Sequence, residues 1–220
     1  MNFRICGLTT LVLGLYALVL IKPFNPPPQI LGTTEPPAVI RGLIIPHHLL
    51  AESLILQGLN AIPPDTEYDQ IIFLFPNHQE QPVLLKEPAY LDILPYLQQR
   101  FPRTLIRPIM VSNRHPNLAP LAVTNNTLLI GAFDFSHYLT AAEAAKRDQL
   151  TLDLIHRHDY LKILKLGNDY TDSPVALTWF LQTLSSLEAN QTQLLAHTNS
   201  GLLTRQLISP ATSYFVMLFF

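Results

Sequence analysis

The chain has little cysteine, little glycine and little charge, and each shortage excludes a class of protein. Its one cysteine, Cys6, lies in an N-terminal apolar run, so the remaining chain offers no disulfide, no cysteine zinc site and no cysteine nucleophile. Only 14% of the 220 residues are charged, and a net charge of −2 without a basic stripe argues against a nucleic-acid partner. The 8 glycines form neither a Gly-x-Gly-x-x-Gly nor a Gly-x4-Gly-Lys nucleotide loop. Any bound metal must therefore be held by histidine, carboxylate or backbone oxygen.

Apolar residues and proline are what the chain has in abundance. Hydrophobic residues make up 48% of it, which is enough for one substantial core in a single domain with a targeting segment. Many of the 19 prolines stand where an apolar segment ends, as at Pro46, Pro76 and Pro102.

The N-terminus carries a long uncharged run at residues 5–21, between Arg4 and Lys22. Its length is at the short end for a membrane-spanning helix and long for a signal-peptide core, and it shows no convincing small-x-small cleavage site. We expect residues 1–22 to form an apolar helix that anchors the chain in a membrane. A cleaved signal segment is the first alternative, and a buried helix is the second.

The rest of the chain divides into a proline-rich linker at residues 23–38 and one folded domain at residues 39–220. The lack of cysteine in the domain suits an exported location. The expected localisation is therefore a chain anchored through residues 5–21, with its domain outside the cytoplasm.

Short apolar runs alternate with helical patterns along the domain. The predicted strands are residues 41–45, 71–75, 105–111, 127–135, 193–197 and 213–220, and the predicted helices are 49–60, 89–100, 141–156, 160–166 and 173–188. This alternation predicts an α/β fold, a single domain with a largely parallel central sheet flanked by helices.

Four of the apolar stretches run straight into polar clusters that contain histidine or aspartate. These clusters hold His47, His78, Asp134 with His137, and His197. Ligands of α/β sheets bind beyond the carboxyl ends of the strands, so histidines that follow neighbouring strands would converge on one pocket. Several imidazoles beside a carboxylate are typical of a metal site.

Asp134 and His137 together end the strongest predicted strand. A carboxylate in that position is costly unless it is paired or ligated. We expect Asp134 to orient a histidine or bind metal, and His137 to act as an acid or base. Ser136 lies between them, but there is no Gly-x-Ser-x-Gly elbow and a triad takes its members from separate segments, which disfavours a nucleophilic hydrolase.

The same residues also have purely structural interpretations. His47 can cap the helix that begins nearby, and His78 can be a loop histidine. His197 can line the pocket or belong to a polar turn. Asp172 is first interpreted as part of a helix N-cap, with a metal ligand as the alternative. His156 and His158 do not share a helix face and are expected at a solvated helix end.

Taken in order, these motifs resemble the Memo family, in particular protein B of the AmmeMemoRadiSam system, over roughly residues 40–218. The matching pieces are Gly42–His47 (GLIIPH), Phe73–His78 (FLFPNH), Asp134–Tyr138 (DFSHY), Asp172–Pro174, His197–Gly201 (HTNSG) and Thr212–Phe215 (TSYF). The resemblance implies a fold like that of the class III extradiol dioxygenases, with a non-haem metal pocket at the strand ends.

By the same resemblance, His47 and His78 match two metal-ligand positions, and Asp134 and His137 match the polar wall where catalysis would occur. The third ligand of relatives is a cysteine or carboxylate before a late helix, and Asp172 stands in that neighbourhood here. Two histidines and one carboxylate form a facial triad suited to Fe(II), with zinc and copper as other divalent candidates.

The chain departs from the family pattern in a short segment after His78, in Pro88 where relatives carry a histidine, and in the missing late cysteine. The sequence therefore predicts a membrane-tethered or exported Memo-like domain, a metal-dependent oxidoreductase acting on an unknown small molecule. A non-catalytic binding module on the same fold and a metal-dependent hydrolase stay open as alternatives.

Overall fold

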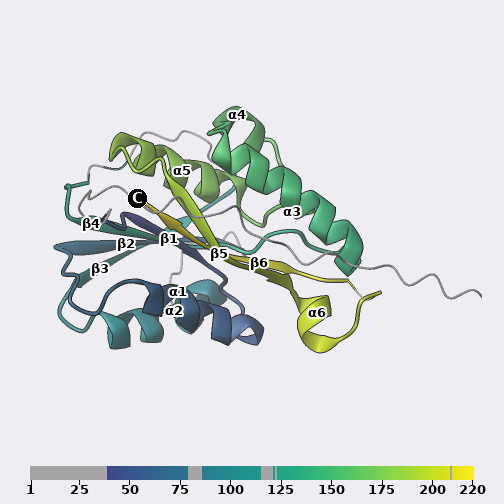
Figure 1. Cartoon of the computed structure of the whole chain (residues 1–220), viewed down its shortest axis with the longest axis horizontal. Helices are drawn as coiled ribbons and strands as arrows, with labels where there is room; N and C mark the ends of the chain where they lie inside the picture. The colour runs from purple at the N-terminus through teal and green to yellow at the C-terminus, as the bar shows by residue number, and fades with distance from the viewer. Residues whose placement is uncertain (1–38, 79–85, 115–120, 122, 209) are drawn as a thin grey trace, which may run out of the picture. The chain divides into compact units, whose positions relative to one another are not determined.

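The computed structural model describes residues 39–78, 86–114, 121, 123–208 and 210–220 (Figure 1). The predicted membrane anchor at residues 1–22 and the linker at residues 23–38 lie outside the described residues. Within the described ranges, no helix is long and apolar enough to cross a membrane.

The described residues form a six-stranded sheet in the order β3-β2-β4-β1-β6-β5. The strands are β1 (Gly42–Ile45), β2 (Gln70–Pro76), β3 (Leu105–Val111), β4 (Thr127–Ala132), β5 (Thr192–Asn199) and β6 (Ser213–Phe219). Strands β3, β2, β4 and β1 are parallel to one another, whereas β6 runs antiparallel to both β1 and β5. The predicted α/β class with a largely parallel sheet is confirmed.

Helices cover both faces of this sheet. They are η1 (Leu49–Ala51, a 3-10 turn), α1 (Glu52–Ala61), α2 (Pro88–Arg100), α3 (Ala141–His156), α4 (Tyr160–Ile163), α5 (Pro174–Ser186) and α6 (Ser200–Thr204). Helices α1 and α2 lie on one face, and α3, α4 and α5 lie on the other (Figure 1).

Alternate residues of the central strands enter two separate apolar cores. In β1, Leu43 and Ile45 pack with α1 and α2, while Ile44 packs on the side of α5. Every residue of β1 and β4 is buried. Strands covered on both faces are continuous apolar runs, which explains why they were readable from the sequence.

The strand predicted over residues 127–135 is shorter in the structure, because its neighbour ends first. The Phe133 amide still donates a hydrogen bond to the Ile45 carbonyl (3.1 Å), but β1 stops there. Phe135 pairs instead with Thr171 in an isolated antiparallel bridge. This bridge brings the segment that carries Asp172 beside the segment that carries Asp134.

The three central strands β2, β4 and β1 are parallel neighbours, so their carboxyl ends meet at one edge of the sheet. His78, Asp134 and His47 each follow one of these strands by two residues. The fold therefore places the predicted site residues together.

Candidate metal centre

His47 lies at the centre of the cluster and is only 2% exposed. Its backbone N–H donates a hydrogen bond to Asp134 Oδ1 (3.1 Å). Its Nδ1 lies 3.6 Å from Asp172 Oδ2, and its Nε2 lies 3.7 Å from Asp134 Oδ2. Both distances exceed a hydrogen bond, so each ring nitrogen faces a carboxylate oxygen across a gap.

His78 is oriented by a carboxylate that sequence reasoning did not assign. Glu87 is buried and is the N-cap of α2, where it accepts a hydrogen bond from the Ala89 amide (3.4 Å). The same carboxylate contacts His78 Nδ1 (2.6 Å) and accepts from the His78 backbone N–H (2.9 Å). His78 Nε2 is thereby left facing Asp172 Oδ2 at 3.5 Å. The only signal in the sequence was an acid directly before Pro88 at a helix start.

Asp172 faces both histidines and does not cap a helix. The predicted N-cap segment at residues 172–174 does begin α5, with Ser173 as the N-cap residue and Pro174 in the first turn, and Asp172 lies one residue before the cap. Asp172 is 7% exposed, and its Oδ2 accepts a hydrogen bond from the Asp134 amide (3.4 Å). Its Oδ1 is buried and has no hydrogen-bond partner among the residues described.

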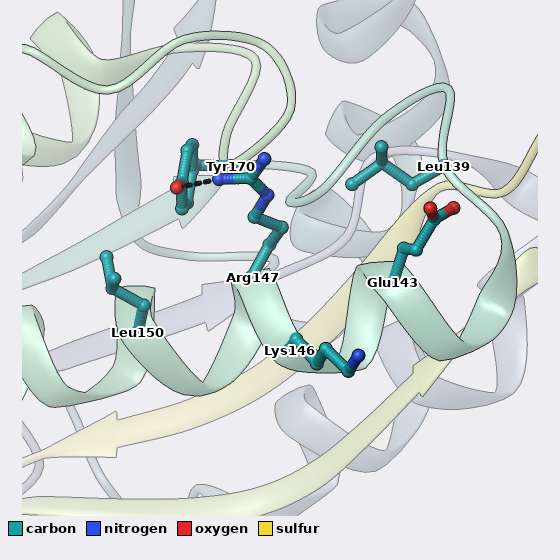
Figure 2. Close-up of a pocket in the computed structure, with 6 residues that line it drawn as sticks. All are labelled: Leu139, Glu143, Lys146, Arg147, Leu150 and Tyr170. Atoms are coloured by element: carbon teal, nitrogen blue, oxygen red, sulfur yellow. Dashed lines mark hydrogen bonds between the residues drawn. The ribbon is translucent and has the colours of Figure 1, made fainter.

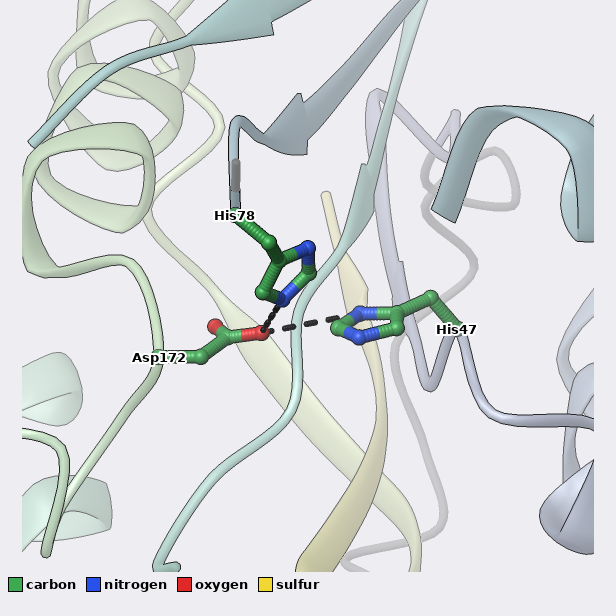
Figure 3. Close-up of side chains that lie close together, drawn as sticks. All are labelled: His47, His78 and Asp172. Atoms are coloured by element: carbon green, nitrogen blue, oxygen red, sulfur yellow. Dashed lines mark ion pairs between the residues drawn. The ribbon is translucent and has the colours of Figure 1, made fainter. Parts of the chain in front are cut away.

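Figure 3 shows His47, His78 and Asp172 pointing toward one another from three separate segments. Bonds of about 2.0–2.2 Å at tetrahedral angles separate the ligand atoms of one metal by about 3.3–3.6 Å. The nitrogen–oxygen distances here, 3.6 Å and 3.5 Å, match that separation. The three donor atoms lie within 4.8 Å of one another, and the arrangement can hold a metal ion.

Asp134 forms a second group with His47 and His48, whose donor atoms also lie within 4.8 Å of one another. Asp134 is fully buried, and its Oδ2 forms an ion pair with Nδ1 of His48, which is 49% exposed. Consecutive residues of a strand point to opposite faces, so within a strand only one of two adjacent histidines would face the pocket. Both reach Asp134, because they lie beyond the last residue of β1, where the pleat no longer sets their direction.

The charges in the site depend on these contacts. Burial disfavours ionised Asp134, but His47 and His48 outweigh it and lower the pKa of the carboxyl group. The bond to Asp134 raises the pKa of His48. Burial alone would lower the pKa of His78, but the nearby carboxylates of Asp172 and Glu87 raise it to about 9.

His137 stands at a small cavity beside the cluster, and burial lowers the pKa of its imidazole. The cavity has a volume of about 150 Å³. Its lining includes His78, His137, Asp172 and three side-chain amides, Asn77, Asn113 and Asn168. Because the lining is mostly polar, the cavity suits a small polar molecule.

Two aromatic residues that could have filled the site do not occupy it. Phe75 lies in the core beside Phe73 and Tyr90. Tyr138 is 76% exposed at the rim of the cavity, with a positive φ of 62°.

Ser136 and His197 belong to a different network, centred on the fully buried Asp148 of α3. Ser136 Oγ donates to Asp148 Oδ1 (2.6 Å), and His197 Nε2 contacts Asp148 Oδ2 (2.7 Å). His197 lies within β5, where a strand was predicted at residues 193–197, and its contact with Asp148 keeps it out of the cluster. Ser136 contacts no histidine in these bonds, so it is not arranged as a catalytic nucleophile.

A groove of about 350 Å³ beside α3 contains none of the predicted site residues (Figure 2). Its floor carries Arg147, which lies over the Tyr170 ring (4.6 Å), donates to the Tyr170 hydroxyl and pairs with Asp169 (3.4 Å). These contacts hold the segment that ends in Asp172. His158 is also remote from the cluster, with its Nδ1 near the Tyr160 hydroxyl (3.3 Å).

No family model matches the chain, and no curated protein is significantly similar to it.

Proposed function

We propose that this domain binds a divalent metal ion through His47 Nδ1, His78 Nε2 and Asp172, and that it is a metal-dependent oxidoreductase of the Memo-like type. The observation that carries the proposal is the pair of 3.5–3.6 Å gaps between Asp172 Oδ2 and the two imidazoles. His47 Nδ1 and Asp172 Oδ1 are buried without a hydrogen-bond partner among the described residues. Polar atoms left in that state are costly, and a cation would satisfy them.

The donor set favours iron. Two imidazoles and one carboxylate leave open coordination positions and suit Fe(II), while zinc and copper accept the same ligands. A bound metal would supply a Lewis acid or redox centre next to the 150 Å³ cavity. His137, whose lowered pKa keeps it neutral near pH 7, can accept a proton from a molecule in that cavity.

The second candidate is a binding module without catalysis on the same fold. It is favoured by the direct contacts His78–Glu87 and His48–Asp134, which already pair charges without an ion. A metal-dependent hydrolase would use the same ligands to activate water. We further propose, on the sequence evidence above, that residues 5–21 anchor the domain outside the cytoplasm.

The decisive experiment is elemental analysis of the full-length chain, purified in detergent without a His tag and with Cys6→Ser to remove its only thiol. We expect at least one equivalent of iron, zinc or copper in this protein and loss of that metal in the His47→Ala/His78→Ala variant. A His156→Ala/His158→Ala variant is the matched control, because it removes two histidines that lie outside the cluster.

Circular dichroism must show that each variant is folded. A wild-type chain that stays metal-free after anaerobic reconstitution would overturn the proposal and leave the binding module. The proposal would equally fail if the His47→Ala/His78→Ala variant retained its metal.

A further inference from the structure

His47 is placed between two carboxylates, with one ring nitrogen toward each. Nδ1 faces Asp172 Oδ2 at 3.6 Å, and Nε2 faces Asp134 Oδ2 at 3.7 Å. A neutral imidazole carries a single N–H, so it can donate a hydrogen bond on one side only. Neither gap is short enough for that bond, so the ring is not held by direct contact with either acid.

Each side of His47 also has its own second histidine. On the first side, His78 Nε2 lies 3.5 Å from the oxygen of Asp172 that His47 faces. On the second side, His48 Nδ1 pairs with the oxygen of Asp134 that His47 faces. The His47 and His78 ring centroids are 4.9 Å apart, as are those of His47 and His48. The two sides are therefore chemically equivalent sets, each with two imidazoles and one carboxylate.

We propose that His47 bridges two cations, with a second metal site formed by His47 Nε2, His48 Nδ1 and Asp134. This rests on the proposed function, because the first cation is the one held by His47 Nδ1, His78 and Asp172. When the second cation binds, the one N–H proton of His47 passes to solvent and the ring becomes an imidazolate. A cation also displaces any proton on His48 and takes its place against Asp134.

Burial and access both support a cation at the second site. Asp134 is fully buried, and a buried carboxylate needs a positive partner. His48 is half exposed, so an ion can enter from solvent and the ring can move away from its contact with Asp134. With two divalent ions, one imidazolate and two carboxylates, the net charge of the centre is +1, and the buried carboxylate of Glu87 lies against His78 beside it.

The competing arrangement holds a single metal. In it Asp134 only accepts a hydrogen bond from His47 Nε2–H and orients the ring, as carboxylates do behind many metal-bound histidines. The two arrangements differ in the number of ions bound and in whether the ions interact through the ring.

The test is a Cu²⁺ titration of the full-length Cys6→Ser chain, followed by elemental analysis and electron paramagnetic resonance. We expect about two coppers per chain with an integrated signal well below two spins, because an imidazolate couples two Cu²⁺ ions antiferromagnetically. His48→Gln keeps an amide donor for Asp134 but no imidazole, and should bind half the copper with one full spin per ion. His158→Ala is the control and should behave like the parent chain.

One copper per chain would overturn the second site, and so would unchanged copper content in a folded His48→Gln variant. Two coppers with two full spins would overturn the bridge. The variant His78→Ala distinguishes the two proposals. If the first site does not exist, His78→Ala binds as much copper as the parent chain. If the second site does not exist, His48→Gln binds as much copper as the parent chain.

Discussion

At the scale of single residues, the geometry of the site depends on which charged groups are buried and which groups they contact in place of water. Glu87 is buried, yet it is satisfied by two backbone amides and the His78 ring. Such a carboxylate fixes the direction of the imidazole, as acids behind metal-bound histidines do. The contact between Glu87 and His78 also makes the stability of the metal-free fold depend on pH.

The pKa of His78 in the fold, about 9, lies above its ordinary value of 6.5. Protonated His78 therefore stabilises the metal-free fold fully below about pH 6.5, and this contribution is lost as the pH rises through about 9. We expect the Tm of the chain in EDTA to fall over this interval. Glu87→Gln should flatten the fall, because glutamine can still accept from the Ala89 amide but carries no charge.

The measurement is differential scanning calorimetry of both proteins from pH 6 to 9.5. The comparison cancels the titration of other groups such as His48. A Tm difference between the two proteins that is the same at pH 6.5 and pH 9.5 would contradict the assigned role of Glu87.

At the scale of elements, α1 packs closely against the sheet near the end of β1, which the histidines of the cluster follow. Gly58 lies where α1 meets β1 and β6, and a Cβ on it would be 2.7 Å from Ile45 Cγ2 and 3.0 Å from Val216 Cγ1. Ile45 is the last residue of β1, two positions before His47. Gly58 therefore permits a close approach of α1 to β1 and β6, and a larger residue at this position would push the helix away from the strands.

Gly58→Ala brings two opposed effects. Alanine gains about 1 kcal/mol of helix propensity over glycine, whereas overpacking of a buried contact costs about 1–3 kcal/mol. We expect the steric cost to win, because both neighbours are buried β-branched side chains. The unfolding free energy should fall by about 1 kcal/mol in urea denaturation. Gln57→Ala on the exposed face of α1 is the control, expected to stay within about 0.5 kcal/mol. A more stable Gly58→Ala protein would show that α1 can shift freely.

At the scale of the whole molecule, a buried polar site is assembled from segments far apart in the chain. His47, His78, Asp134 and Asp172 come from separate segments that β-strand pairing and one isolated bridge bring together. Site formation therefore depends on the pairing of β1, β2 and β4, which are covered by apolar cores on both faces. The chain adds to this domain an uncharged N-terminal run at residues 5–21.

The apolar run at residues 5–21 predicts that the chain is associated with membranes in cells. We expect it to stay with membranes through alkaline carbonate extraction, because an uncleaved apolar helix is held by the hydrocarbon core. A variant with Leu11→Arg and Leu15→Arg should be released, since a charged side chain in the membrane centre costs about 2.5–3.5 kcal/mol. Release of the unaltered chain in the soluble fraction, with residues 1–22 missing by mass spectrometry, would instead identify a cleaved signal.

The elements of this fold were accessible from local patterns, because a buried strand is a continuous apolar run and an amphipathic helix repeats along one face. The 3-10 turn η1, the early end of β4 and the short helix α6 were not, since each depends on neighbours in space. Among the site residues, the ends of β1, β2 and β4 placed His47, His78 and Asp134 together as expected. His197, for which pocket lining and a turn were both open, contacts Asp148 and lies outside the cluster.

The amino-acid sequence by itself determined the α/β class, the parallel strands and the presence of histidine and aspartate at their carboxyl ends. These properties follow from residue spacing along the chain. The tertiary structure alone decided which acid faces which histidine: Asp172 turned toward His47, Glu87 behind His78, and Asp148 with His197. Those pairings depend on strand order and on loop paths between strands, which are set by how the two cores close and leave no periodic trace in the sequence.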